Sequence, residues 1–282
     1  LKAIERANEN TNLKQVIDLL KTRGIPAYIE TILGLPEETL NSFKEGLYRL
    51  IDDIEYHNYI EIYTMVALPN TPFGDPEYLK KYGIKIVKTA PCFFHHEHPP
   101  EKLMADTSDC VVGSNVMSYD DYLKACGWGW YMRSVHFFGW LRILAIELKK
   151  KYNITHRQFY DDLFDWFVQN PSTLLHEEYY ETGNFLENVF KNKIPWGRKV
   201  KGASDIYWEY EEATCIHIAK NKKRFYNEIG DFLENTYNSR HTVLVKKQSN
   251  KMLDPFLVYN GDLEKYAREC LWWGRRSEKF FV

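Results

Sequence analysis

Residues 30–43 read ETILGLPEETLNSF and hold the end of a strand, a tight turn and the start of a helix. Residues 28–33, which overlap the start of this stretch, form an extended run that Pro26 opens. After the turn, apolar residues at positions 40, 43, 47, 50, 51 and 54 recur at helical spacing. The stretch therefore predicts a strand, a turn at residues 34–36 and an amphipathic helix.

A second strand follows the helix. Residues 59–70 read YIEIYTMVALPN, another extended run that ends in a proline turn, and a helical pattern at residues 13–20 precedes the first strand. Helix, strand, helix and strand with short joints are typical of parallel βαβ units. Because two strands do not make a stable sheet alone, we expect one part of a barrel or of a doubly wound sheet.

Each predicted strand carries an acid. Glu30 shares a face with Tyr28 and Ile32, and Glu61 shares one with Tyr63. An unpaired carboxylate buried inside a sheet would cost on the order of several kcal/mol, a large part of the stability of a typical domain. A polar lumen that binds a ligand would resolve this conflict. The alternative is that both acids lie near strand starts and reach solvent or a basic side chain.

The turns after the two strands are the expected ligand position, because ligands of such folds bind beyond the carboxyl ends of the strands. Gly34 allows a ligand to approach the backbone. Pro36 fits the first turn of the following helix, and Glu37 and Glu38 suit its positive end, which disfavours a phosphate there. An uncharged flat partner such as a nucleoside base fits better. The alternative is an ordinary strand-to-helix turn.

The two motifs together resemble the later half of the radical S-adenosylmethionine (SAM) core barrel, in the subgroup with an N-terminal cobalamin-binding domain. Members show a D/E-x-I-x-G-x-P-G-E-T stretch on the fifth barrel strand, and Glu30, Ile32, Gly34, Pro36, Glu38 and Thr39 match it. Glu37 stands where the family usually has glycine. Residues 68–78, LPNTPFGDPEY, resemble the segment after the sixth strand, and Arg6 lies at a basic position common in the family.

The resemblance implies a fold, cofactors and a site. It implies that the backbone near Ile32, Gly34 and Leu35, and that near Val66 and Leu68, lines the adenine of SAM, with Glu30 as a lumen group. It also implies SAM, a [4Fe-4S] cluster and cobalamin in the full-length enzyme, a 5′-deoxyadenosyl radical, and in many members methyl transfer to an unreactive carbon. No catalytic residue and no metal ligand is assigned.

The cluster loop of that family, Cys-x-x-x-Cys-x-x-Cys, is absent from this sequence. Its five cysteines, Cys92, Cys110, Cys126, Cys215 and Cys270, are too far apart to form it and are expected to be buried thiols in a reducing compartment, the cytoplasm. We therefore expect this chain to be the C-terminal portion of a larger enzyme, inactive alone. Its partners would be the missing N-terminal part, with the cluster loop and cobalamin domain, and a small-molecule substrate.

The rest of the chain divides by pattern. We expect a partial barrel at residues 1–90, an irregular linker at 91–120 and a helical, aromatic-rich domain at 121–282, the first helix of which runs to Lys151. The aromatic stripe of that helix, including Trp128 and Trp130, is typical of a core, although it could also grip an apolar substrate. The linker residues 95–98, HHEH, fit a solvated loop, a substrate pocket or a metal site.

Composition limits the function classes. The formal net charge is −2 without a long run of one sign, which argues against general nucleic-acid or anionic-membrane binding. No segment approaches the ~20 apolar residues of a membrane span. The fold class is thus α/β, a partial radical SAM barrel followed by a mostly α-helical domain. Two alternatives remain: a non-catalytic helical binding or scaffold module with a vestigial barrel fragment, and a hydrolase that uses Glu30 or residues 95–98.

Overall fold

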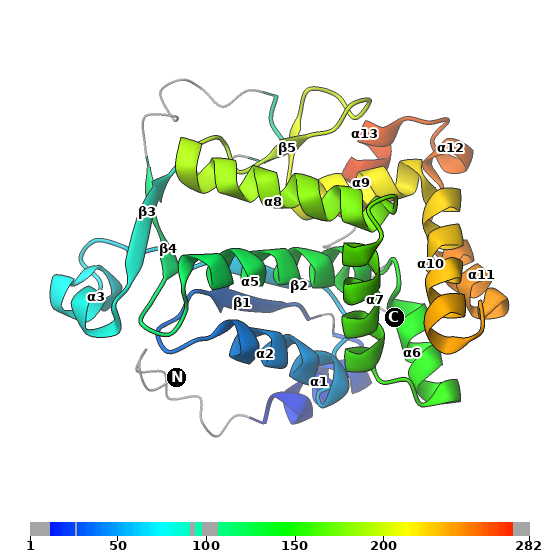
Figure 1. Ribbon diagram of the computed structural model, residues 1–282, viewed down its shortest axis with the longest axis horizontal. Helices are drawn as coiled ribbons and strands as arrows, with labels where there is room; N and C mark the ends of the chain where they lie inside the picture. Colours follow the sequence, from blue (N-terminus) through cyan, green and yellow to red (C-terminus); the bar gives the residue numbers. More distant parts are fainter. Residues whose placement is uncertain (1–11, 26, 91–93, 98–106, 273–282) are drawn as a thin grey trace. The chain divides into compact units, whose positions relative to one another are not determined.

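The computed structural model describes residues 12–25, 27–90, 94–97 and 107–272 (Figure 1). They form a mixed α/β fold, and no closed barrel occurs in these ranges. The helices and strands, in chain order, are α1 (Leu13–Thr22), β1 (Ile29–Leu33), α2 (Leu40–Asp52), β2 (Ile60–Thr64), η3 (Pro72–Gly74), α3 (Pro76–Tyr82), β3 (Lys85–Thr89), β4 (Ser108–Gly113), α5 (Tyr119–Met132), η4 (Arg133–Phe137), α6 (Arg142–Tyr152), α7 (His156–Gln169), α8 (Leu174–Asn192), β5 (Arg198–Lys199), β6 (Tyr207–Trp208), α9 (Tyr210–Lys220), α10 (Lys222–Tyr237), α11 (Thr242–Lys251), α12 (Pro255–Val258), α13 (Leu263–Tyr266) and η5 (Ala267–Trp272).

The chain folds into two compact units. The described residues of unit 1 lie within Leu1–Phe93, Pro99–Gly129 and Gly183–Trp196, and those of unit 2 within Phe94–His98, Trp130–Thr182 and Gly197–Val282. Helices α5 and α8 each contribute residues to both units. The sequence-based boundaries near residues 90 and 120 remain an interpretation, because the chain enters both units more than once.

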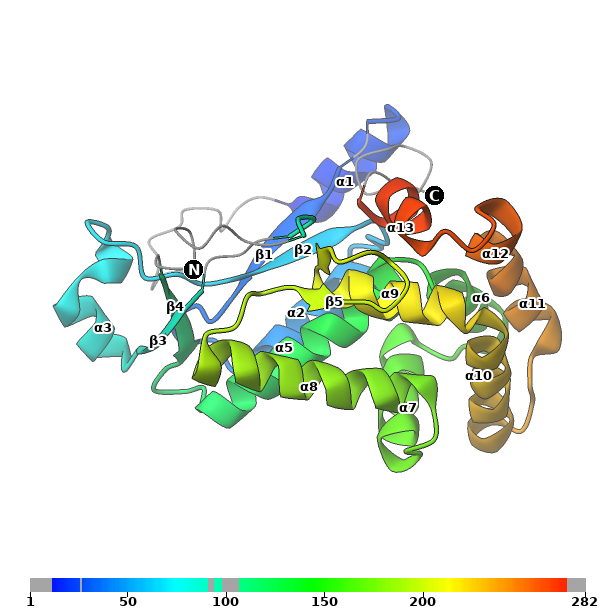
Figure 2. The same cartoon turned by 90° about the horizontal axis from the view of Figure 1, so that it is seen from above.

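Unit 1 is built on a parallel pair of strands. β1 and β2 pair in register, with Ile29 opposite Ile60 and Leu33 opposite Thr64. Both α2 and α5 lie on one side of this pair (Figure 2). The approach of α5 is close, since a methyl group at Gly129 would lie 3.2 Å from Ile62 and 3.6 Å from Phe43 of α2. The predicted β-α-β order and parallel pairing are therefore correct.

Helix α2 begins later than the sequence indicated. It starts at Leu40, with Thr39 and Ser42 forming a reciprocal capping box, and its first turn contains no acidic residue. Pro36 is therefore not a first-turn proline, and the expectation that Glu37 and Glu38 occupy the positive helix end was wrong. A Thr-x-x-Ser cap satisfies the free amides of the first turn, so acids are not needed there.

The expected irregular segment 91–120 contains a strand. β4 pairs antiparallel with β3, and an isolated bridge between Val66 and Cys110 joins β4 to the chain just after β2. The amide of Val111 donates to the carbonyl of Met65 at 2.9 Å. The apolar run at residues 110–112, which ends at Gly113, is the sequence signal that would have indicated this strand.

Unit 2 is helical, as the sequence predicted for most of its residues. Its core holds α7 and α10 side chains such as Phe159 and Phe232, whose ring centroids lie 5.9 Å apart. The expected continuous helix to Lys151 is broken, because η4 leads into a turn at Gly139, whose φ is +92°. A glycine adopts this backbone conformation without the steric cost that a Cβ would add.

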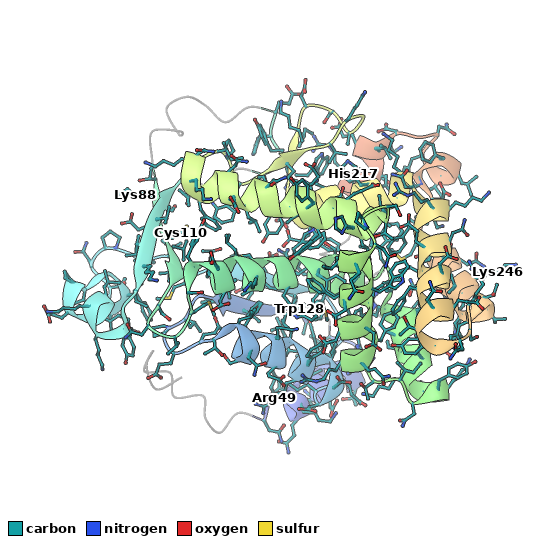
Figure 3. All side chains as sticks on the ribbon, in the orientation of Figure 1. Arg49, Lys88, Cys110, Trp128, His217 and Lys246 are labelled. Atoms are coloured by element: carbon teal, nitrogen blue, oxygen red, sulfur yellow. The ribbon has the colours of Figure 1, made fainter. Side chains whose placement is uncertain are left out.

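The aromatic stripe is core in both units. Trp128 in unit 1 is 3% exposed, and in unit 2 Trp130 and Trp140 are fully buried. Trp128 projects from α5 (Figure 3), with the Lys44 ammonium 3.8 Å from its ring centroid. The buried His136 shares a hydrogen bond of 2.7 Å with the Tyr160 hydroxyl. The core interpretation of the stripe is therefore confirmed, and its rings are not available to grip a ligand.

Helix α6 receives its cap from a distant glutamine. The carbonyl oxygen of Gln248, on α11, accepts from the amides of Ile143 and Leu144 at 2.8 and 3.1 Å, and its amide donates to the Gly139 carbonyl at 2.8 Å. Gln248 is fully buried. Leu141, the residue at the N-cap, has no side chain that can do this. One side chain thus ties α11, α6 and the Gly139 turn together.

None of the helices in the described ranges is both long and apolar enough to span a bilayer.

We predict that Gln248→Ala lowers the free energy of unfolding by about 2–4 kcal/mol, because it leaves two amides and one carbonyl buried without partners. Urea denaturation followed by tryptophan fluorescence measures this. Gln158→Ala, at an exposed position of α7, is the matched control and should change stability by less than about 0.5 kcal/mol. Equal stability of both variants would contradict the capping role.

Candidate functional site

The ends of β1 and β2 meet at one edge of the pair. The amide of Met65 donates to the Leu33 carbonyl at 2.9 Å, which continues the pairing by one residue. The turn at residues 34–36 therefore lies beside residues 65–67, as the sequence predicted for parallel strands. Of the residues expected to contact adenine, Ile32 is 41% exposed and Leu68 is 54% exposed. Gly34 is buried, and Leu35 and Val66 are half-buried.

Position 34 requires glycine because of its backbone angle. From the sequence, we had inferred a different reason, the close approach of a ligand. Its φ is +97°, a conformation that a residue with a Cβ rarely adopts. An added Cβ would meet side-chain atoms of Tyr122 and Val111, each at 3.5 Å. These side chains lie beside the Cα of Gly34, and the expectation that a ligand approaches the backbone there stays a prediction.

Glu37, which stands where the family pattern has glycine, adopts a backbone conformation that glycine favours. Its φ is +66°, in the left-handed region. The Glu37 side chain therefore pays the steric cost of this region, which a glycine would not pay.

Glu38 folds back onto the turn. Its Oε2 accepts the Gly34 amide at 2.9 Å. Burial raises the pKa of this carboxyl to about 7, against the opposing effect of hydrogen bonds from the Gly34 and Leu35 amides. The sequence placed Glu38 in the motif but not in this role. The carboxyl stabilises the turn. It also accepts hydrogen bonds from the Gly34 and Leu35 amides, in the stretch of backbone that the resemblance places next to the adenine of SAM.

Glu30 and Glu61 are directly paired across β1 and β2. Glu30 is exposed, while Glu61 is half-buried and its Oε2 accepts the Tyr59 hydroxyl at 2.5 Å. On the same face, Tyr28 is 60% and Tyr63 is 50% exposed. We name this set (Tyr28, Glu30, Ile32, Glu61 and Tyr63) the open face. It combines apolar surface with two carboxylates, which is suited to an organic ligand that carries polar or cationic groups.

Residues 94–97 are solvated only in part: His96 and Glu97 are exposed, while His95 packs against unit 2. The amide of His95 donates to the Tyr207 carbonyl at 2.7 Å, and the Tyr207 amide donates to the His96 carbonyl at 3.0 Å. His95 Nε2 lies 2.8 Å from Oε2 of the fully buried Glu212. This places His95 in the core of unit 2. His98 lies outside the described residues.

A second buried acid of unit 2 binds three neighbours. Oε2 of Glu178 lies 2.9 Å from Arg198 and accepts the Thr214 hydroxyl at 2.7 Å, while Oε1 contacts His217 Nδ1. Burial alone would raise the pKa of Glu178, but the hydrogen bond from His217 and the charge of Arg198 outweigh it, and the pKa is lowered. The sequence gave no local sign of this cluster, whose members come from α8, β5 and α9.

Four cysteines lie in the described ranges. Cys110, Cys126, Cys215 and Cys270 are all free and buried, as the sequence predicted, and Cys92 lies outside those ranges. Burial raises the pKa of the Cys110 thiol. Within the described part of the chain, no group of three or more His, Cys, Asp or Glu side chains is arranged to hold a metal ion.

We predict a pH-dependent stability that Glu38 controls. Because the folded-state pKa is raised from 4.5 to about 7, the folded state holds a proton that the unfolded state releases between these values. The contribution of Glu38 to stability is then fully present below pH ~4.5 and is lost, by up to roughly 3 kcal/mol, as pH rises to ~7. Urea denaturation across this range measures the slope. In Glu38→Gln this component should vanish, and an unchanged slope would contradict the assignment.

We predict that Gly34→Ala and Glu37→Gly act in opposite directions. Gly34→Ala should lower the free energy of unfolding by about 1–2 kcal/mol, because alanine is strained at this angle. Glu37→Gly should be neutral or stabilising by up to about 1 kcal/mol, because it removes strain while adding unfolded-state entropy. Thermal denaturation compares the two. If Glu37→Gly lowers the free energy of unfolding more than Gly34→Ala does, the backbone angles do not determine the effect of these substitutions.

Two characterised methyltransferases are similar to this chain. It is 28% identical to the 2-(S-pantetheinyl)-carbapenam-3-carboxylate methyltransferase of Streptantibioticus cattleyicolor over 248 residues, which cover 83% of this chain and 36% of that protein. It is 26% identical to the cobalamin-dependent radical SAM methyltransferase TokK of Streptomyces tokunonensis over 293 aligned positions, 97% of this chain and 42% of that protein. No family model matches the sequence.

The chain thus spans about two fifths of the length of these relatives. The similarity extends over most of the chain, including unit 2, which the sequence motifs of unit 1 did not cover. The chain is a distant relative of the radical SAM methyltransferases.

Proposed function

We propose that this chain is part of a cobalamin-dependent radical SAM enzyme that transfers a methyl group to an unreactive carbon of a small molecule. The observation that carries the proposal is the open face. Two parallel strands are covered by α2 and α5 on one side, while the other side exposes Tyr28, Ile32 and Tyr63. The similarity to two methyltransferases along nearly the whole chain supports the same reaction class.

In this proposal β1 and β2 are the fifth and sixth strands of a barrel. The helices of a (β/α) barrel lie outside it, and the inner side chains of its strands line the centre. The position of α2 and α5 on one side of the strands makes the open face the inner one. Glu30 and Glu61 are then lumen groups. This would explain why both strands carry an acid where a fully covered parallel strand would be apolar.

The residues at the strand ends fit the adenosine part of SAM through their side chains. Ile32 and Leu68 expose apolar surface at the carboxyl ends of the strands. The Gly34 and Leu35 amides are already held by Glu38. We therefore assign adenine contact to the Ile32 and Leu68 side chains, with Val66 beside them, and give Glu38 the role of fixing the turn that positions them. Bound SAM and cobalamin would supply the methyl group.

The described residues do not fit an iron–sulfur cluster, because no three of their cysteines, histidines or acids converge. We assign the cluster loop and the cobalamin domain to an N-terminal part of the same protein. We therefore expect the natural reading frame to encode a Cys-x-x-x-Cys-x-x-Cys loop before this segment.

We predict that Ile32→Asp and Leu68→Asp each weaken SAM binding by the full-length protein about tenfold or more, since a carboxylate cannot replace an apolar contact with adenine. Equilibrium dialysis with labelled SAM measures this. Leu19→Asp, at a residue of α1 that is 50% exposed, is the control and should bind SAM normally. Undiminished binding in both site variants would refute the assignment of this edge.

A further inference from the structure

One surface of unit 2 combines apolar and basic side chains. Residues 252–258 read MLDPFLV and include α12. Four large apolar side chains of this segment are exposed: Leu253 at 41%, Phe256 at 52%, Leu257 at 83% and Val258 at 55%. Isolated exposed apolar residues are ordinary, but four within six positions form a patch of the kind that marks an interaction site.

A hollow of about 500 Å³ lies beside this patch. Phe256 and Asp254 line one part of it, and residues 219–224 at the junction of α9 and α10 line another, with Asn227. Lys220, Lys222 and Lys223 are among these lining residues. The surface therefore pairs a projecting apolar segment with a basic depression.

Basic residues outnumber acidic ones in this region, where residues 219–258 hold eight Lys or Arg and four Asp or Glu. Residues 235–253 contain Arg240, Lys246, Lys247 and Lys251 but no Asp or Glu, and neither do residues 219–227, although the whole chain has a net charge of −2. Three of the basic residues are neutralised: Arg224 by Glu177 and Glu228, Arg240 by Asp231, and Lys247 by Glu147.

Most of the other lysines of this surface form no ion pair with a described residue. In the ranges that the structure describes, Lys220, Lys223, Lys246 and Lys251 have no carboxylate partner, and Lys222 donates to the Met252 carbonyl at 2.7 Å. Lys246 points outward from α11 (Figure 3). Burial lowers the pKa of Lys222, partly offset by the charge of Asp254. Asp254 itself caps α12, where it accepts the Phe256 amide at 3.0 Å.

We propose that Leu253, Phe256, Leu257 and Val258, together with Lys220, Lys223 and Lys251, form a docking surface for an acidic protein. Protein interfaces have an apolar centre surrounded by a polar rim, and complementary charge sets orientation and association rate. The uncompensated lysines select a partner with carboxylates around an apolar contact. This inference does not depend on the proposed methyl transfer.

The shape of the surface favours a protein over a lipid bilayer. Membrane-surface helices present a long apolar face flanked by basic residues. Helix α12 has four residues, and the lysines nearest to it line a hollow. A protein partner with a complementary, irregular surface can fill the hollow and contact the lysines that line it. A flat bilayer surface cannot enter the hollow.

The test uses the 282-residue chain and a fluorescent amphipathic peptide of about 18 residues, roughly five helical turns, with leucines on one face and glutamates on the other. Binding is measured by anisotropy at about 0.05 and 0.2 M salt. We expect binding that weakens with salt. A peptide with lysines in place of the glutamates, and vesicles of phosphatidylcholine with phosphatidylserine, are tested in parallel.

Two double variants separate the parts of the surface. K220A/K223A and F256S/L257S should each weaken peptide binding about tenfold or more. The controls are K150A/K193A, at exposed lysines elsewhere, and Tyr180→Ser, at a residue that is 63% exposed; both should bind as the original chain does. All changes are at exposed side chains, and circular dichroism verifies folding.

Three results would overturn the proposal. One is equal binding of the acidic and the basic peptide, or no binding of either. Another is unchanged affinity in both site variants. The third is binding of the anionic vesicles without binding of the acidic peptide, which would assign the surface to a membrane.

Discussion

The parallel pairing of β1 and β2 is the constraint on which unit 1 depends. A parallel pair requires the chain to cross over between the strands, and α2 makes this crossing. The helix then covers one face, together with α5, which approaches so closely that a Cβ at Gly129 would lie 3.2 Å from the Ile62 side chain. The other face keeps its mixture of aromatic and acidic side chains. Because α2 and α5 cover only one side of the strand pair, the side chains on its other side form the open face.

The turn that follows β1 links this framework to the candidate site. A single carboxyl, that of Glu38, holds the Gly34 and Leu35 amides, and it does so in a partly buried place that raises its pKa to about 7. The turn also contains two residues with positive φ, Gly34 and Glu37. Of these two, only Glu37 carries backbone strain, because Gly34 has no Cβ that could clash.

Unit 2 is organised by buried polar side chains between its helices. Gln248 caps α6 from α11, Glu178 joins α8 to β5 and α9, and Glu212 receives His95 from a short segment far away in sequence. Each of these groups would be costly to bury alone, so each requires its partners to be in place. Such contacts specify how the helices pack.

The sequence by itself determined the local order of unit 1: two strands, an intervening helix, their parallel direction and the acid on each strand. It also indicated that the aromatic stripe is core, because local periodicity reports which side of an element is buried. It did not reveal β4, the start of α2 at Leu40, the roles of Gly34 and Glu38, or the burial of His95. These depend on partners distant in the chain, such as Tyr122 for Gly34 and Glu212 for His95. Only the tertiary structure brings such partners together, because the free energy of a buried polar group or a strained turn is decided by what surrounds it in space.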